Sequence, residues 1–320
     1  MSAPALLDPA VVHRLGRLRL RLRRRIDGRF VGGHPARGYG SSQDFTDYRE
    51  YVAGDDPRLL DPHAWARHRK LLIRQYAAED TAAVTVVVDG SRSMTFAGKA
   101  RAAHQVAAAL AVIATSSGDR VRVAVAGTTV TTGPWYAGGA GMAAALARLG
   151  RELPTGAGGE PAGGGGEPTG DGADDARDRG GPPGAATGVD LVAALDRIRR
   201  QGQRGPMIVI SDLLTPAWPQ VIARLGADRG DALLVHLLSP DEIEPAVTGD
   251  VRLVDAETGS DVELAVSDST LARYRATRDA WFDGIARACG ARGISQVRHV
   301  ADQAAETLIA VELRRLGWVA

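Results

Sequence analysis

A Val-rich run that ends in regularly spaced oxygen side chains constrains this chain more than any other feature. Residues 84–88 read Val-Thr-Val-Val-Val, and Asp89, Ser91 and Ser93 follow at alternate positions. Such a run is typical of a strand buried on both faces of a parallel sheet, and such sheets bind ligands beyond the carboxyl ends of their strands. Carboxylate and hydroxyl oxygens suit a hard cation such as Mg²⁺. The pattern therefore predicts an oxygen-lined cation site.

A second strand of the same kind supports this interpretation. Residues 206–210 are apolar and are followed directly by Ser211 and Asp212. An alternative exists for the first segment, because Asp and Ser before a helix also satisfy its unpaired amides as an N-cap. Because two predicted strands both end in Ser or Asp, we favour the cation site over the helix N-cap as the role of residues 89–93.

The order Asp-x-Ser-x-Ser at residues 89–93 resembles the metal-ion-dependent adhesion site of von Willebrand factor A domains. The resemblance implies that the two serines contact a Mg²⁺, Mn²⁺ or Ca²⁺ ion, that Asp89 acts through water and that Asp212 is the second aspartate. It also implies a threonine ligand, but Val189 stands at the aligned position. Either Thr187 supplies this ligand from a shifted loop, or the site keeps four ligands.

A second resemblance covers the region before this domain. Residues 48–76 contain Arg-Glu-Tyr, Gly-Asp-Asp-x-Arg, Asp61, Ala-Arg and Leu-Leu-Ile-Arg in that order. This resembles the signature of the bacterial domain of unknown function 58 family, although Pro62 stands where that family commonly has Trp. The resemblance implies a von Willebrand A-like domain downstream and a role as adaptor for a MoxR-type AAA+ ATPase in protein assembly or maturation.

The rest of the pattern predicts an α/β fold with a doubly wound, mostly parallel sheet of the von Willebrand A or Rossmann-like type. An N-terminal accessory region (1–80) precedes the main domain (81–320), which carries a β-hairpin insertion at about 250–265. The Gly- and Pro-rich stretch at about 154–186 is predicted to be disordered. Strands are expected near 83–89, 121–126, 128–132, 206–211, 231–237 and 294–299, and helices near 97–116, 139–150, 188–201, 216–226, 268–289 and 303–316.

The N-terminal quarter carries the positive charge. Residues 1–78 contain 15 Lys and Arg against 8 Asp and Glu, whereas the whole chain has a net charge of only +1. Apolar residues recur at helical spacing from Val11 to Ile26 with arginines between them, which predicts a basic amphipathic helix. It would either present a solvated face or dock on an acidic partner or an anionic membrane surface through Arg23, Arg24 and Arg25. No nucleic-acid motif accompanies it.

The Gly-Asp-Asp-Pro-Arg segment at 54–58 also allows two interpretations. Gly, Asp and Pro form turns, and Asp beside Arg makes a charge-assisted brace, so a structural role is expected. The alternative is a surface loop that a partner binds through Asp55, Asp56 and Arg58.

Composition narrows the class of protein. One cysteine, Cys289, excludes a disulfide framework and suits the cytoplasm, and no apolar stretch is long enough to span a membrane.

We expect a non-enzymatic interaction module whose bound cation accepts an acidic residue from a partner protein. Two alternatives are a metal-free scaffold with a decayed site and a metal-dependent phosphate-ester hydrolase. The hydrolase is disfavoured because Ser91 stands where such enzymes carry a second acid.

Overall fold

The computed structural model describes residues 6–21, 45–52, 55, 57, 60–76, 81–152, 189–201, 205–227, 231–255 and 260–320. They belong to two compact units. One comprises residues 25–81, and the other joins residues 1–24 to residues 82–320. The first residues of the chain therefore belong to the large unit and not to the small one. The predicted insert at 154–186 lies outside the described residues.

The large unit is built on a six-stranded, mostly parallel sheet. Its strand order is β10-β7-β6-β3-β4-β5, and only β5 runs antiparallel, against β4. The strands are β3 (Ala83–Asp89), β4 (Arg120–Ala126), β5 (Val130–Thr132), β6 (Met207–Ser211), β7 (Ala232–Leu238) and β10 (Ser295–Val300). This confirms the predicted mixed α/β class and places the end of β3 beside the end of β6.

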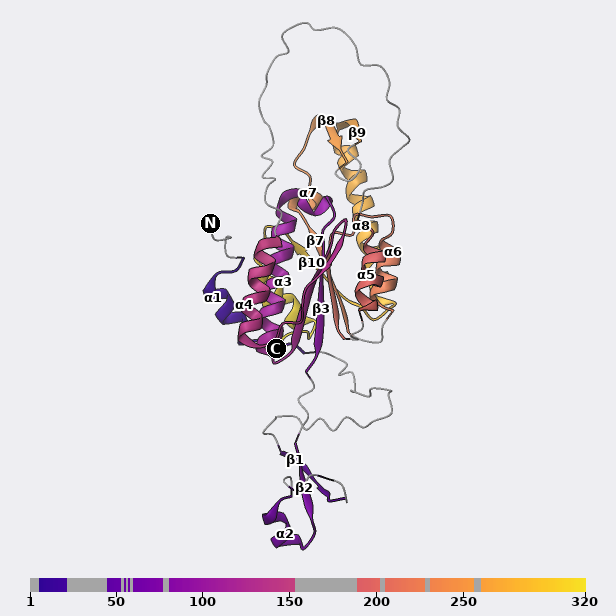
Figure 1. Ribbon diagram of the computed structural model, residues 1–320. Helices are drawn as coiled ribbons and strands as arrows, with labels where there is room; N and C mark the ends of the chain where they lie inside the picture. Colours follow the sequence, from indigo (N-terminus) through magenta and orange to yellow (C-terminus); the bar gives the residue numbers. More distant parts are fainter. Residues whose placement is uncertain are drawn as a thin grey trace. The chain divides into compact units, whose positions relative to one another are not determined.

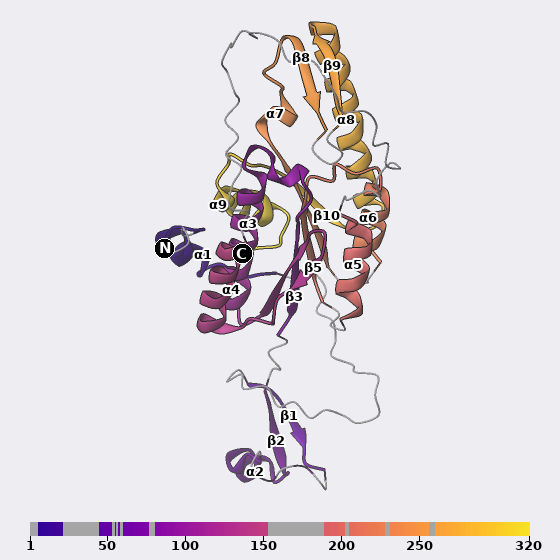
Figure 2. The same cartoon turned by 45° about the horizontal axis from the view of Figure 1, so that its top comes forward.

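Helices cover both faces of this sheet, as Figures 1 and 2 show. On one face lie α3 (Lys99–Ser116) and α4 (Gly138–Glu152). On the other lie α5 (Leu191–Arg200), α6 (Trp218–Leu225) and the long α8 (Asp268–Gly290). All seven residues of β3 are buried, as expected for a strand covered on both faces.

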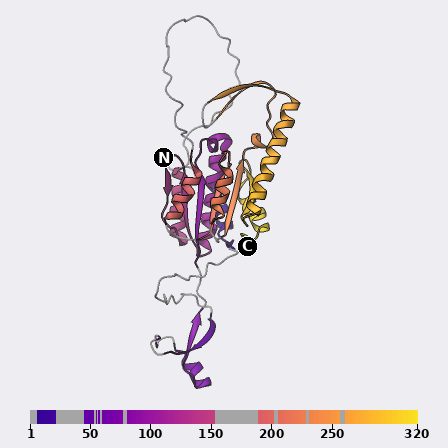
Figure 3. The same cartoon turned by 90° about the vertical axis from the view of Figure 1, so that its right-hand side faces the viewer.

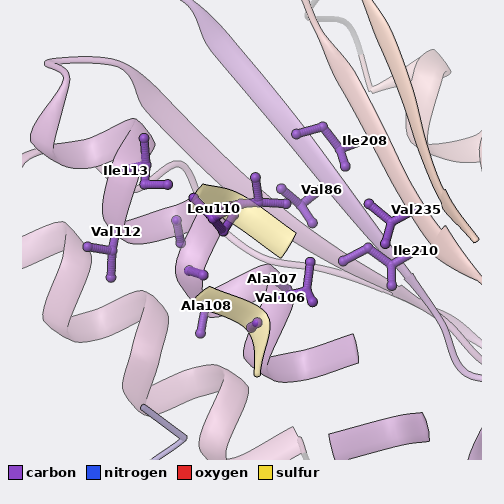
Figure 4. Close-up of a cluster of buried hydrophobic side chains, with 14 of the residues drawn as sticks. Val86, Val106, Ala107, Ala108, Leu110, Val112, Ile113, Ile208, Ile210 and Val235 are labelled. Carbon is purple, nitrogen blue, oxygen red and sulfur yellow. The ribbon is translucent and has the colours of Figure 1, made fainter. Parts of the chain in front are cut away.

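Two apolar cores result, one on each face of the sheet. Alternate residues of β3 point to opposite cores, so Val86 and Val88 pack with α3 while Val87 packs with α5 and α6. The close-up in Figure 4 shows Leu110 of α3 beside Val86 of β3, and Val106 of α3 beside Ile210 of β6. The alanines of α3 let this helix lie close to the sheet, and 14 of its residues are buried.

The predicted basic N-terminal helix is much shorter than its spacing suggested. The helix α1 (Pro9–Leu15) is capped by Asp8 and ends at Gly16. Beyond it, Leu20 pairs with Val319 in an antiparallel bridge, so the chain is extended there. Tertiary pairing with the C-terminus overrides helical periodicity. At that end, the predicted helix at 303–316 is α9 (Ala305–Thr307) followed by the π-helical η3 (Leu308–Leu313).

The predicted hairpin insertion is present. Strands β8 (Gly249–Val254) and β9 (Asp261–Val266) pair antiparallel after the short helix α7 (Pro240–Ile243). Figures 1 and 3 show the hairpin beside the N-terminal half of α8, beyond the sheet on the side where α7 lies. No described helix is long and apolar enough to cross a membrane.

The small unit contains an antiparallel pair, β1 (Phe45–Glu50) and β2 (Leu72–Tyr76), and the helix α2 (Pro62–His68). Buried Asp61 caps α2 by accepting from the His63 amide at 2.8 Å, and it also accepts from the Tyr48 hydroxyl at 2.7 Å. Pro62 occupies the first helical position, where its missing N–H costs nothing. The departure from the family pattern at this residue is thus compatible with the helix.

Asp55 forms a charge-assisted brace with Arg49. Buried Asp55 accepts from Arg49 at 2.8 Å and from the backbone of Val52 at 2.9 Å. These contacts give Asp55 a structural part within the small unit. Asp56 and Arg58, the other candidate partner-binding residues of this segment, lie outside the described residues.

Candidate metal centre

Asp89 is a buried carboxylate at the end of β3. It is only 6% exposed. One oxygen accepts from the Ser91 amide at 2.9 Å, and the other accepts from the Ser211 hydroxyl at 2.5 Å. Burial raises the pKa of Asp89 to about 6; the Ser211 and Ser91 hydrogen bonds oppose the rise and the charge of Asp212 adds to it. The hydrogen bond from Ser211 to Asp89 joins the end of β6 to the end of β3.

The turn after Asp89 brings two hydroxyls together. Gly90 lies against β4, where an added Cβ would come within 3.2 Å of the Ala126 carbonyl oxygen. The hydroxyls of Ser91 and Ser93 are 3.0 Å apart, and Ser93 is buried. Neither the 3₁₀ turn η2 (Ser93–Gly98) nor α3 has a side-chain cap. The N-cap alternative is therefore wrong for this segment.

Asp212 lies in a tight turn at the end of β6. It is 1% exposed, and the amide of Leu214 donates to it at 3.1 Å. The next residue, Leu213, has a positive φ of 53°, which is unusual for a side chain of this size. Its buried side chain packs in the core beside α5 and α6, and its amide donates to Ser211 at 2.9 Å. Packing and hydrogen bonds thus hold a strained turn that fixes Asp212.

A buried lysine also binds Asp212. The ammonium of Lys99, the first residue of α3, lies 2.7 Å from the Asp212 carboxylate, and Lys99 is 0% exposed. The same ammonium contacts Glu242 of α7. Glu242 and Ser239 form a capping box, in which the Ser239 amide donates to the Glu242 carboxylate at 2.7 Å. The candidate site is therefore connected to the start of α7.

His236 supports Asp212 from β7. Its Nε2 lies 3.0 Å from the Asp212 carbonyl oxygen, and its ring meets Trp281 and Phe282 edge-on at 5.0 and 5.5 Å. Burial is the main reason that the pKa of His236 falls to about 4. The imidazole is therefore neutral at physiological pH, and it positions the backbone of the turn.

The donor set fits a hard cation. Asp89, Ser91, Ser93 and Asp212 offer carboxylate and hydroxyl oxygens at adjacent strand ends, the ligands that Mg²⁺ or Mn²⁺ takes together with water. An ionised carboxylate has about four acceptor positions, so its hydrogen bonds leave capacity for a metal or its water. Within the described residues, no cluster of three or more His, Cys, Asp or Glu could hold a metal. A metal site at these strand ends would therefore need the hydroxyls of Ser91 and Ser93 as ligands.

The fifth expected ligand is not placed by the structure. Thr187 lies outside the described residues. Val189, the residue at the aligned position, packs against the core beside α5, and Asp190 caps α5 by accepting from Ala193 at 2.9 Å. Neither Val189 nor Asp190 therefore acts as the missing hydroxyl ligand. Arg23, Arg24 and Arg25, the candidate partner-binding arginines, also lie outside the described residues.

The sequence interpretation missed Lys99 and Glu242. A signal for each was present. Lys99 is one of only two lysines among 39 Lys and Arg residues, and Ser239-x-x-Glu242 matches the capping-box pattern. What no pattern indicated was that the side chains would meet, since residues 99 and 242 are far apart along the chain.

A comparison with protein families finds one that matches most of this chain. The family described as "Protein of unknown function DUF58" matches residues 47–280, and the chain belongs to this family.

Its relatives extend the match to nearly the whole chain. The uncharacterized protein Rv1480 of Mycobacterium tuberculosis is 30% identical over 98% of this chain and 92% of its own length. The uncharacterized protein MAV169 of Mycobacterium avium is 36% identical over 43% of this chain and 85% of its own length.

Two solved structures show a distant likeness. A conserved hypothetical protein, BatB from Bacteroides thetaiotaomicron, is 12% identical with a TM-score of 0.39, over 74% of this chain and 98% of that chain. An aerotolerance-related membrane protein from Bacteroides fragilis is 11% identical with a TM-score of 0.37, over 72% of this chain and 96% of that chain.

Proposed function

We propose that this chain is a non-enzymatic interaction module with a von Willebrand A-like domain, which holds a divalent cation through an adhesion-type site. The observation that carries the proposal is the meeting of two oxygen-bearing strand ends, joined by the hydrogen bond from Ser211 to Asp89 at 2.5 Å. Asp89, Ser91, Ser93 and Asp212 would hold the ion. A cation bound through neutral hydroxyls stays electrophilic and accepts a carboxylate from a partner protein.

Exposed apolar side chains on the two site loops support a protein partner. Phe96 follows Ser93 by three residues and is 52% exposed, and Leu214 follows Asp212 by two residues and is 47% exposed. Large apolar residues at the surface near a polar centre are typical of contact sites between proteins. A partner that offers an acidic residue between apolar contacts would match this arrangement.

The partner class follows from the family resemblance. We propose a MoxR-type AAA+ ATPase that meets the module in the cytoplasm, with a role in protein assembly or maturation. An acidic loop on the ATPase would supply the last ligand of the ion.

A metal-free scaffold is the second candidate, and Lys99 is the observation that favours it. Its ammonium already neutralises part of the negative charge at Asp212 and Glu242. In that case partner binding would not depend on divalent ions.

Partner binding in the presence and absence of metal tests the proposal. The purified chain and a MoxR-type ATPase from the same genome would be combined in Mg²⁺ and in EDTA, and the dissociation constant measured by interferometry. We expect binding in Mg²⁺ that is lost in EDTA and in Ser91→Ala, but kept in Ser117→Ala, a control at the far end of α3. Equal binding in Mg²⁺ and EDTA would favour the scaffold instead.

A further inference from the structure

The strongest unexplained feature of the large unit is the buried lysine at the candidate site. The chain uses arginine almost throughout, and Lys99 and Lys70 are its only lysines. Lys70 is exposed and pairs with Glu50 in the small unit, whereas Lys99 has no exposed surface. A compact ammonium on a flexible stem can serve as a point charge in a confined space, which a planar guanidinium cannot do.

Local electrostatics oppose a lysine at this position. Lys99 is the first residue of α3, where the partial positive charge of the helix dipole disfavours a cation. Burial adds a large desolvation cost, which only well-placed carboxylates can offset. Asp212 supplies one at 2.7 Å and Glu242 supplies the other. The lysine is thus retained by two anions that belong to different elements, β6 and α7.

The charges of the cluster do not balance. The ammonium of Lys99 contacts the carboxylates of Asp212 and Glu242, and the charge of Asp212 in turn acts on the buried carboxylate of Asp89. When all three are ionised the cluster carries two net negative charges, which one divalent cation would neutralise. Asp212 is the shared group, since it binds Lys99 and is also an expected metal ligand.

We propose that Lys99 is a resident counter-cation that competes with the divalent ion for Asp212. This rests on the proposed function of the site. When the ion binds, the ammonium moves from Asp212 toward Glu242, which remains its partner. Lys99 thereby lowers the affinity of the site for metal, and it stabilises the cluster while the metal is absent.

The movement would reach the surface around α7. Glu242 accepts from the Ser239 amide at 2.7 Å through its carboxylate, and its carbonyl oxygen accepts from the Tyr274 hydroxyl of α8 at 2.6 Å. Any shift of charge at Glu242 therefore acts on the capping box of α7, which leads into the β8–β9 hairpin.

Selective labelling of the two lysines tests the movement in the wild-type protein. With ¹³Cε-labelled lysine, the full chain should give one signal for Lys99 and one for Lys70, assigned with Lys70→Arg. We expect the Lys99 signal to shift on titration with Mg²⁺ while the Lys70 signal stays in place. A Lys99 signal that stays unchanged while calorimetry shows Mg²⁺ binding would overturn the inference and leave the proposed function intact.

A substitution tests the competition independently. Removing one unit charge at this distance should tighten the Mg²⁺ dissociation constant of Lys99→Met at least about tenfold relative to wild type. The variant should also melt at a lower temperature in EDTA and recover in Mg²⁺, with Lys70→Met as matched control. If wild type binds no Mg²⁺, binding by Lys99→Met alone would support the competition, and no binding by either would refute both the inference and the metal site.

Discussion

Replacing Asp89 by Asn should stabilise the metal-free protein at alkaline pH while it abolishes cation binding. The Asp89 carboxyl is buried, and its pKa is raised from 3.8 to about 6. At 1.36 kcal/mol for each pKa unit, ionising this group costs the folded state roughly 3 kcal/mol. Asn has nearly the same shape and no charge to desolvate, and its oxygen can still accept from the Ser91 amide.

The direction of the pKa shift of Asp89 determines the pH range over which this carboxyl changes the folding stability. Because the folded pKa lies above the unfolded value, the folded state binds more protons between about pH 4 and pH 6. The contribution of Asp89 to stability therefore falls as pH rises through this window, and Asp89→Asn removes this contribution. His236, whose pKa is lowered to about 4, contributes the opposite trend in both proteins, so only the difference between them reports on Asp89. We expect the variant to gain about 2 to 3 kcal/mol over wild type at pH 8 and nothing at pH 4.

Urea unfolding in EDTA, followed by tryptophan fluorescence at pH 4 and pH 8, would measure this difference. Asp190→Asn is the matched control, because Asn caps a helix about as well as Asp and Asp190 caps α5. If Asp89→Asn were less stable than wild type at pH 8, the desolvation argument for this carboxylate would be refuted.

Three further predictions concern other contacts. Ser211→Ala should raise the pKa of Asp89 above about 6, because the lost hydroxyl stabilises the carboxylate; the pH midpoint of Mg²⁺ binding would report this. Asp61→Ala should cost the small unit about 1 to 2 kcal/mol by removing the α2 cap and the bond from Tyr48, measured by hydrogen exchange of α2. Ile113→Ala should leave a cavity in the core and cost roughly 2 to 5 kcal/mol in urea unfolding.

The sequence predicted secondary structure best where strand burial or a local turn determines the conformation of the chain. The run at 83–89 is buried on both faces, so its composition alone predicted β3 with the observed ends. The strands expected near 121–126 and 128–132 and the hairpin expected at about 250–265 likewise correspond to the β4–β5 and β8–β9 pairs. In each case the signal lies within a few residues, because local turn chemistry and strand burial decide the structure.

Long-range pairing explains what the sequence did not indicate. The spacing from Val11 to Ile26 is helical, yet Leu20 pairs with Val319, a residue almost 300 positions away. Lys99 similarly meets Glu242 because β6 pairs with both β3 and β7, which brings the segments that follow these strands together. A pattern within one segment carries no information on such contacts. The candidate oxygens at the ends of β3 and β6 could be named from sequence, but the ammonium beside them could not.

Isothermal titration of Mg²⁺ into chelator-stripped protein tests the central claim most directly. Wild type would be compared with Asp89→Ala and Ser91→Ala, and with Ser117→Ala as a control for lost hydroxyls. The account predicts saturable binding to one site in wild type and in the control, and loss of binding in both site variants. Binding of equal strength in all four proteins would contradict a cation site at the ends of β3 and β6.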